Sequence, residues 1–159
     1  MTTFELVEYD DPRAVELRRL MDVEMSARYE MHLIPDATLE AIGTALAVDP
    51  ATISATVLAI SNGGAPVGHA ALRPKGDSWE VKRVIVLDSV RGQGVGAGLM
   101  NELERLTREA GVTRMVLQTG DRQPEAVRLY ERLGYTPIPV YAPYDVVLPQ
   151  SLCFEKVLA

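Results

Sequence analysis

The chain has 159 residues, of which 47% are hydrophobic and 24% charged, a composition typical of one globular domain with a sizeable core. The net charge of −6 arises from residues 1–50, which hold 4 Arg and Lys against 11 Asp and Glu. Because nucleic-acid binding needs clustered basic side chains, this balance argues against a nucleic-acid partner. No apolar run reaches the ~18 residues of a membrane-spanning helix, so we expect no membrane partner.

Cys153 is the single cysteine, which excludes an internal disulfide and a cysteine-based metal cluster, and we expect no metal. The first residues show no basic segment followed by an apolar stretch, so no secretory signal is predicted and a cytoplasmic location is expected. The acidic first third is either ordinary solvated surface or a field that attracts a cationic ligand.

Alternation, turn residues and helix caps predict the following elements in chain order: a strand at 3–9, a helix from Pro12 to about 28, a helix at 38–48 capped by Asp36, a strand at 53–60, a strand at 66–72, a strand at 79–87, a helix ending near 110, a strand at 114–118, a helix at 124–133 and a strand at 151–158. Turns are predicted at 62–64 and at 74–77. Hairpins come first and helices then alternate with strands. This order predicts a single α/β domain over residues 1–159, with a mixed sheet and helices on both of its faces.

Four glycines follow the strand at 79–87 and lead directly into an amphipathic helix: Gly92, Gly94, Gly96 and Gly98. Glycines let backbone N–H groups approach an anion closely, and the start of a helix adds partial positive charge. Arg91 is placed to add a charged hydrogen bond. The segment therefore predicts a site for a phosphate or pyrophosphate group.

The same loop formally satisfies the dinucleotide pattern GxGxxA over residues 92–97. That pattern normally follows the first strand and is joined by an acidic residue about 20 positions later, and neither condition holds here. No Gly-Lys-Ser/Thr follows the loop, which excludes a P-loop. A loop that serves only tight packing is the structural alternative.

Two segments together resemble the GNAT acetyltransferase superfamily. Residues 91–96, Arg-Gly-Gln-Gly-Val-Gly, are similar to its Arg/Gln-x-x-Gly-x-Gly/Ala signature, and residues 123–135, QPEAVRLYERLGY, are similar to its Asn-x-x-Ala-x-x-Leu-Tyr-x-x-x-Gly-Phe segment. The resemblance covers about residues 50–159. It implies a GNAT-like fold with a mixed, mostly antiparallel central sheet that is splayed between its fourth and fifth strands.

The resemblance implies that acetyl-CoA, as co-substrate, binds in this split. Backbone groups of three strand residues would pair with the pantetheine arm, and backbone amides of the glycine loop would hold the pyrophosphate. Gln123 stands where the family usually has an asparagine, so its contact with pantetheine is in question. The implied cofactor-binding residues are Val84, Ile85, Val86, Arg91, Gly92, Gln93, Gly94, Val95, Gly96, Ala97 and Gln123.

The resemblance also implies two catalytic residues. Glu80 matches the position of a general base, acting directly or through water, and Tyr130 matches a tyrosine that protonates the CoA thiolate. As alternatives, Glu80 is an exposed strand residue paired with Lys82 or a neighbouring arginine, and Tyr130 is a core aromatic residue. A bulge in this strand, frequent in the family, would change which face Glu80 shares with Val84.

Three further residues have suitable chemistry without a matching motif. His32 could line an acceptor cleft, His69 is placed in a sheet strand, and Cys153 is expected to be a small buried residue. No nucleophile with a partnering base is apparent, which favours direct attack on the thioester over an acyl-enzyme.

The function predicted from the sequence is an acetyl-CoA-dependent N-acetyltransferase that acts on an amine of a small molecule or peptide. The alternative is a non-catalytic module that binds and senses acyl-CoA. The sequence names no acceptor, and it leaves a homodimer open.

Overall fold

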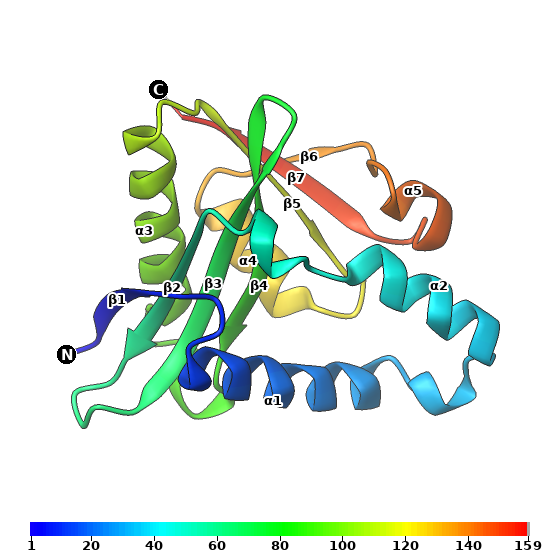
Figure 1. The fold of residues 1–159 in the computed structure, drawn as a ribbon, viewed down its shortest axis with the longest axis horizontal. Helices are drawn as coiled ribbons and strands as arrows, with labels where there is room; N and C mark the ends of the chain where they lie inside the picture. Colours follow the sequence, from blue (N-terminus) through cyan, green and yellow to red (C-terminus); the bar gives the residue numbers. More distant parts are fainter. Residues whose placement is uncertain (159) are drawn as a thin grey trace.

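A computed structural model describes residues 1–158, whose strands form a seven-stranded sheet in the order β1-β2-β3-β4-β5-β7-β6 (Figure 1). Only β4 and β5 pair in parallel, and the other neighbours are antiparallel. The strands are β1 (Thr3–Val7), β2 (Ala55–Ile60), β3 (Pro66–Lys75), β4 (Ser78–Val86), β5 (Arg114–Thr119), β6 (Thr136–Ile138) and β7 (Leu152–Val157). The α-helices are α1 (Pro12–Arg28), α2 (Asp36–Leu46), α3 (Val95–Glu109), α4 (Pro124–Arg132) and α5 (Tyr144–Val147). The predicted mixed α/β fold is confirmed.

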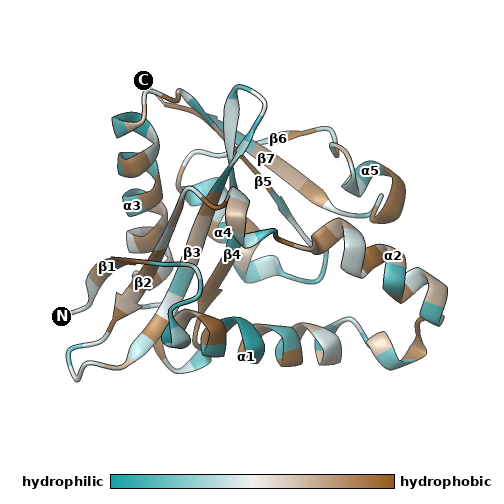
Figure 2. Cartoon of the chain, viewed as in Figure 1, coloured by the Kyte–Doolittle hydropathy of each residue, from teal (hydrophilic) through white to brown (hydrophobic). Residues whose placement is uncertain are grey.

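Helices pack on both faces of the sheet, and the two faces have separate cores. Alternate residues of β2 divide between them: Val57 and Ala59 pack with α3 and α4, whereas Leu58 and Ile60 pack with α1. The sheet is mostly hydrophobic, while α1 and α3 carry both kinds of residue (Figure 2). In α3 the buried residues lie on one side, as expected for an amphipathic helix packed on a sheet. Among residues 1–158, no helix is both long and apolar enough to cross a membrane.

Local signals set several helix ends. The Asp11 carboxylate accepts a hydrogen bond from the Arg13 N–H at 2.9 Å, and Pro12 occupies the first turn, so α1 begins as predicted. The predicted cap of α2 is wrong, because Pro35 holds the N-cap position and Asp36 lies inside the first turn, where its charge suits the helix dipole.

Other differences have simple causes. Strand β3 continues through Pro74 to Lys75, because this outer part of the hairpin still pairs with Trp79 and Ser78, so the turn is limited to Gly76 and Asp77. Strand β6 and helix α5 were not predicted from the sequence. Both are too short to show a hydrophobic period, and β6 contains a proline at the edge of the sheet.

A β-bulge at Arg83 interrupts β4. Arg83 has a left-handed φ of 57°, and the pairing with β3 jumps from Ala71↔Lys82 to His69↔Ile85. The bulge reverses the alternation of side chains, so Val81 packs with α3 and α4 whereas Ile85 packs with α1. Glu80 and Lys82, which precede the bulge, therefore do not share a face with Val84.

His69 and Arg18 hold the bulge. The Arg18 guanidinium lies 2.9 Å from His69 Nε2, and the Arg83 carbonyl oxygen lies 2.7 Å from His69 Nδ1. Since arginine is always a donor, Nε2 accepts, and Nδ1 carries the proton that is donated to Arg83. The structure thus requires the neutral imidazole. These hydrogen bonds offset the cost of a left-handed non-glycine residue, which is about 1–3 kcal/mol.

The split between β4 and β5 begins beside this bulge. The two strands pair only from Trp79↔Met115 to Val81↔Leu117. Beyond Val81, β4 stays paired with β3 while β5 stays paired with β7. The predicted splay between the fourth and fifth strands is therefore present, and it leaves one side of the backbone at residues 82–86 without a strand partner.

We expect His69 to make folding sensitive to acid. Burial, and after it the charge of Arg18, lower the pKa of His69 from 6.5 to about 4. The unfolded chain therefore binds more protons than the folded one between these values, so stability is complete above pH 6.5 and falls as the pH drops towards 4. The expected loss is about 1–3 kcal/mol in the free energy of unfolding, measured by urea denaturation across this window.

The variant His69→Gln keeps a neutral donor and acceptor and should flatten the pH dependence over the same window. His32→Gln changes the other, exposed histidine and should keep the wild-type slope. An unaltered slope in His69→Gln would assign the acid sensitivity to other groups.

Candidate active site

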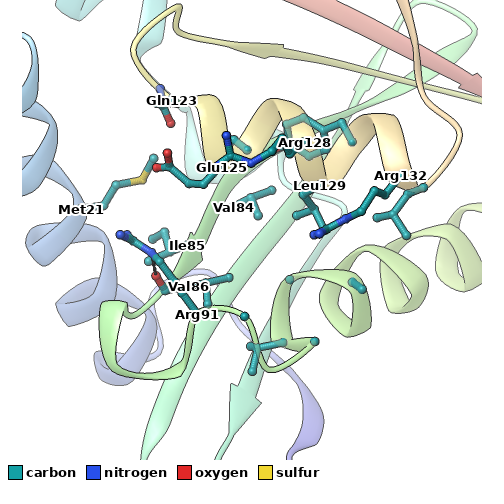
Figure 3. Close-up of a pocket in the computed structure, with 18 of the residues that line it drawn as sticks. Met21, Val84, Ile85, Val86, Arg91, Gln123, Glu125, Arg128, Leu129 and Arg132 are labelled. Carbon is teal, nitrogen blue, oxygen red and sulfur yellow. Dashed lines mark hydrogen bonds between the residues drawn. The ribbon is translucent and has the colours of Figure 1, made fainter.

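A cavity of about 740 Å³ lies between α1, β4, the glycine loop and α4 (Figure 3). Its lining includes ten of the residues predicted to bind the cofactor: Val84, Ile85, Val86, Arg91, Gly92, Gly94, Val95, Gly96, Ala97 and Gln123. Gln93 is the exception. Its side chain is exposed, and its amide lies 3.5 Å from the Ser89 carbonyl oxygen. The structure thus gathers the predicted residues along one wall and places the Gln93 side chain outside it.

The glycine loop requires glycine at two positions by its backbone. Gly92 and Gly94 have φ values of 79° and 83°, and Gly94 is the N-cap of α3. A Cβ on Gly96 would lie 2.9 Å from the Leu129 side chain, so glycine there lets α3 approach α4. The N–H of Gly98 donates to the Gly94 carbonyl, which leaves the preceding N–H groups of the first turn free for an anion.

Arg91 is already engaged by carboxylates at the edge of the cavity. Its guanidinium donates to both oxygens of Glu24 at 3.0 and 3.2 Å, and it contacts Asp88 at 2.8 Å. Its Nε also donates to the Val86 carbonyl at 3.1 Å, which fixes the side chain against β4. An incoming anion would therefore compete with Glu24 for Arg91.

Two more cations, Arg128 and Arg132, line the cavity from α4, across from the glycine loop (Figure 3). Neither arginine was predicted as a site residue, although their i, i+4 spacing places them on one side of a helix. Arg28 of α1 forms an ion pair with Glu125 of α4, so the two helices are joined across the cavity. The cavity combines unpaired backbone N–H groups with three arginines, a chemistry suited to phosphate groups.

Tyr130 lies beside the split in the sheet and is 5% exposed. Its ring packs edge-on against Tyr135 and tilted against Phe154, at centroid distances of 5.9 and 6.1 Å. Burial raises the pKa of its hydroxyl, which keeps the phenol protonated. Within residues 1–158, no side chain forms a hydrogen bond with that hydroxyl, so its proton is available to a ligand.

A second cavity, of about 360 Å³, adjoins the first. Five residues line both: Met21, Met25, Val84, Gln123 and Tyr130. Its other apolar walls come from the segment that links α1 to α2, from α2 itself and from the segment that follows α5, and are Met31, Ile34, Ile42, Leu46 and Leu148. Polar groups enter from β4 and β5, including Lys82, Gln118 and Thr119. The two cavities thus meet where Val84 and Tyr130 lie.

Glu80 lines neither of these cavities and is 1% exposed. Its carboxylate accepts hydrogen bonds from Arg73 Nε at 2.8 Å, from the Tyr141 hydroxyl at 2.7 Å and from the Tyr144 hydroxyl at 3.3 Å. The role of Glu80 as a general base stays a prediction. In this geometry it would need water to carry the proton.

The remaining candidates are scattered. His32 is exposed and lines neither cavity, while His69 holds the bulge. Cys153 lies buried in β7 as predicted, and burial raises the pKa of its thiol. Among residues 1–158, no group of three or more His, Cys, Asp or Glu side chains is arranged to hold a metal ion.

Comparison with known proteins agrees with this geometry. Residues 15–135 match the model of the acetyltransferase (GNAT) family. The chain therefore belongs to the GNAT family of acetyltransferases, and the fold expected from the two motifs is confirmed.

Individual relatives give further context. The "IAA acetyltransferase" of Azospirillum brasilense is 34% identical over 91 residues, which span 57% of this chain and 59% of that protein. A candidate acyl-CoA N-acyltransferase from Klebsiella pneumoniae has a similar structure, with a TM-score of 0.79, 27% identity, and coverage of 100% of this chain and 99% of that one. A GNAT acetyltransferase from Elizabethkingia anophelis, solved with acetyl-CoA bound, shares the fold at a TM-score of 0.68 and 17% identity, with coverage of 99% and 98%.

Proposed function

We propose that this protein transfers the acetyl group of acetyl-CoA directly to an amine of a small molecule or peptide. The observation that carries the proposal is the meeting of two cavities at Val84 and Tyr130, one suited to a phosphate-bearing cofactor and the other to an acceptor. Acetyl-CoA supplies an acetyl group activated as a thioester. The site residues hold the two reactants and move one proton.

The larger cavity fits the cofactor. The N–H groups at the start of α3 and the guanidinium of Arg91 would hold the pyrophosphate, and Arg128 and Arg132 would receive further phosphate charge. Val84, Ile85 and Val86 would offer backbone groups to the pantetheine arm, because β5 diverges from β4 beyond Val81. Gln123 lines the cavity, and its amide nitrogen lies 3.4 Å from the Tyr29 hydroxyl.

Tyr130 acts as the general acid in this proposal. Its protonated hydroxyl donates to the sulfur atom that leaves as CoA, while a backbone N–H of residues 84–86 polarises the acetyl carbonyl. Cys153 lines neither cavity, which supports direct attack by the amine rather than transfer through a cysteine. The acceptor must lose its ammonium proton before attack, and Glu80, acting through water, is the predicted acceptor of that proton.

The proposal is tested first by binding and turnover. Acetyl-CoA should raise the melting temperature more than NAD does, and an amine library should give CoA release that depends on the acceptor. Binding without CoA release from any amine would favour the alternative of a non-catalytic acyl-CoA sensor. If acetyl-CoA does not bind, the proposal is refuted.

Replacing Gly94 with valine should weaken acetyl-CoA binding at least tenfold, measured by calorimetry, because a side chain at the N-cap of α3 enters the anion site. Gly64→Val is the matched control. Gly64 has a similar φ of 88° and equally open surroundings, but it lies in the β2–β3 turn. Equal affinities in the two variants would show that the loop does not hold the pyrophosphate.

Tyr130→Phe should lower kcat by ~10²-fold, the range for loss of a general acid, and leave the Kd for acetyl-CoA nearly unchanged. The ring remains, so its packing against Tyr135 and Phe154 is kept. Stopped-flow or steady-state CoA release measures the effect. Full activity in this variant would reduce Tyr130 to a packing residue.

Glu24→Gln should tighten acetyl-CoA binding by about 2–5-fold, because it removes the carboxylate that competes for Arg91. The gain should shrink at high salt, where charges are screened. Glu16→Gln changes an exposed ion pair with Arg19 on the same helix and should leave the Kd unaltered. Weaker binding in Glu24→Gln would mean that Glu24 positions Arg91 rather than competing with the ligand.

A further inference from the structure

Lys82 is a buried cation in the second cavity. It is 7% exposed, and its Nζ donates a hydrogen bond to the Tyr144 hydroxyl at 2.7 Å. Among residues 1–158, no carboxylate oxygen lies within 4.0 Å of this ammonium group. A buried charge is costly unless it is paired, so an unpaired lysine at this position calls for an explanation.

The neighbouring charges are already matched with one another. Arg73 pairs with Glu80 at 2.8 Å, and Arg83 pairs with Asp22 at 2.9 Å. Lys82 therefore forms no ion pair of its own, and it is linked to a carboxylate only through the Tyr144 hydroxyl, which accepts from Lys82 and donates to Glu80. Burial lowers the pKa of the Lys82 ammonium to about 8, and the nearby charge of Glu80 offsets this effect only in part.

The bulge at Arg83 determines that the Lys82 side chain faces the second cavity. It sends Val84 towards α3 and α4, whereas Lys82 remains on the side of the sheet that faces α1 and α5. Lys82 thus lines only the second cavity, the one proposed for the acceptor, whereas Val84, two residues later, lines both cavities. A charged anchor and the point of acetyl transfer are set two positions apart along one strand.

We propose that the acceptor carries a carboxylate as well as an amine, and that Lys82 binds this carboxylate. The inference deepens the proposed function and rests on it. Met31, Ile42 and Leu46 provide an apolar wall for the body of the acceptor. Asp121 is exposed on the loop before Gln123 and suits the ammonium end. The predicted acceptor class is therefore an amino acid with an apolar side chain or spacer.

The first test measures binding without turnover. The probe is 4-methylpentanoate, an apolar carboxylate that lacks an amine, and its comparison is the uncharged 4-methylpentanamide, both titrated by calorimetry into protein saturated with CoA. The wild type should bind the carboxylate about 10–100-fold more tightly than the amide, the range for a hydrogen bond between charged groups. Lys82→Met removes the ammonium group while keeping an unbranched side chain of nearly the same length, and it should lose this difference.

The matched control is Lys75→Met. Lys75 is a second cation in the same region, but it donates to the Ala142 carbonyl, lies against the Tyr141 ring and lines neither cavity. This variant should keep the preference for the carboxylate. Melting temperatures and acetyl-CoA affinity, measured for all three proteins, show whether each variant is folded.

The second test measures turnover with leucine, leucinamide and 3-methylbutylamine, together with ω-amino acids of increasing length. In the wild type, kcat/KM should be highest for a carboxylate-bearing amine, and the best length gives the spacing between amine and anchor. Lys82→Met should lower kcat/KM for that acceptor 10–100-fold, mainly through KM, and change the uncharged amines less than about threefold.

The outcomes separate the two proposals. If no amine gives CoA release in the wild type, the proposed acetyl transfer fails. If amines react but carboxylates have no advantage in binding or kcat/KM, the anchor at Lys82 is refuted while acetyl transfer stands. If Lys82→Met lowers kcat equally for all amines, Lys82 handles a proton rather than a carboxylate, and the inference is overturned.

Discussion

The left-handed backbone at Arg83 is the constraint on which the site depends. It inserts one residue into β4, and the strand then stays with β3 while β5 follows β7. It also reverses the alternation of side chains, so that residues before and after it face different helices. Because His69 and Arg18 hold this conformation from β3 and α1, the geometry of the candidate cofactor wall depends on contacts between elements, including one between Arg18 and His69, which lie 51 residues apart in sequence.

Features that rest on local backbone chemistry were predictable. Gly92 and Gly94 adopt positive φ values that only glycine takes easily, and a helix begins immediately after them, so the sequence alone predicts this loop geometry, which would suit an anion. The position of Tyr130 beside the cavity followed from its motif. The hairpins and α1 were predicted for the same reason, since turn residues and the Asp11 cap act within a few positions.

Features that depend on packing between distant segments were not predictable. A plain alternation places Glu80 and Val84 on one face, and only the bulge separates them, leaving Glu80 in a cluster with Arg73 and two tyrosines. The short helix α5, which carries Tyr144, gave no periodic signal, so the surroundings of Lys82 could not be read from sequence. Glu24 likewise gave no sign that it meets Arg91, 67 residues away.

The walls shared by the two cavities have a consequence for damage by oxidants. Met21 and Met25 line both cavities and Met31 lines the second, so three thioethers contribute to the surface against which an acceptor would pack. Thioethers adapt to ligands of different outline, but oxidation converts them to polar sulfoxides. Since Cys153 is buried in β7, these methionines, rather than the thiol, are the sulfur atoms through which peroxide would reach the site.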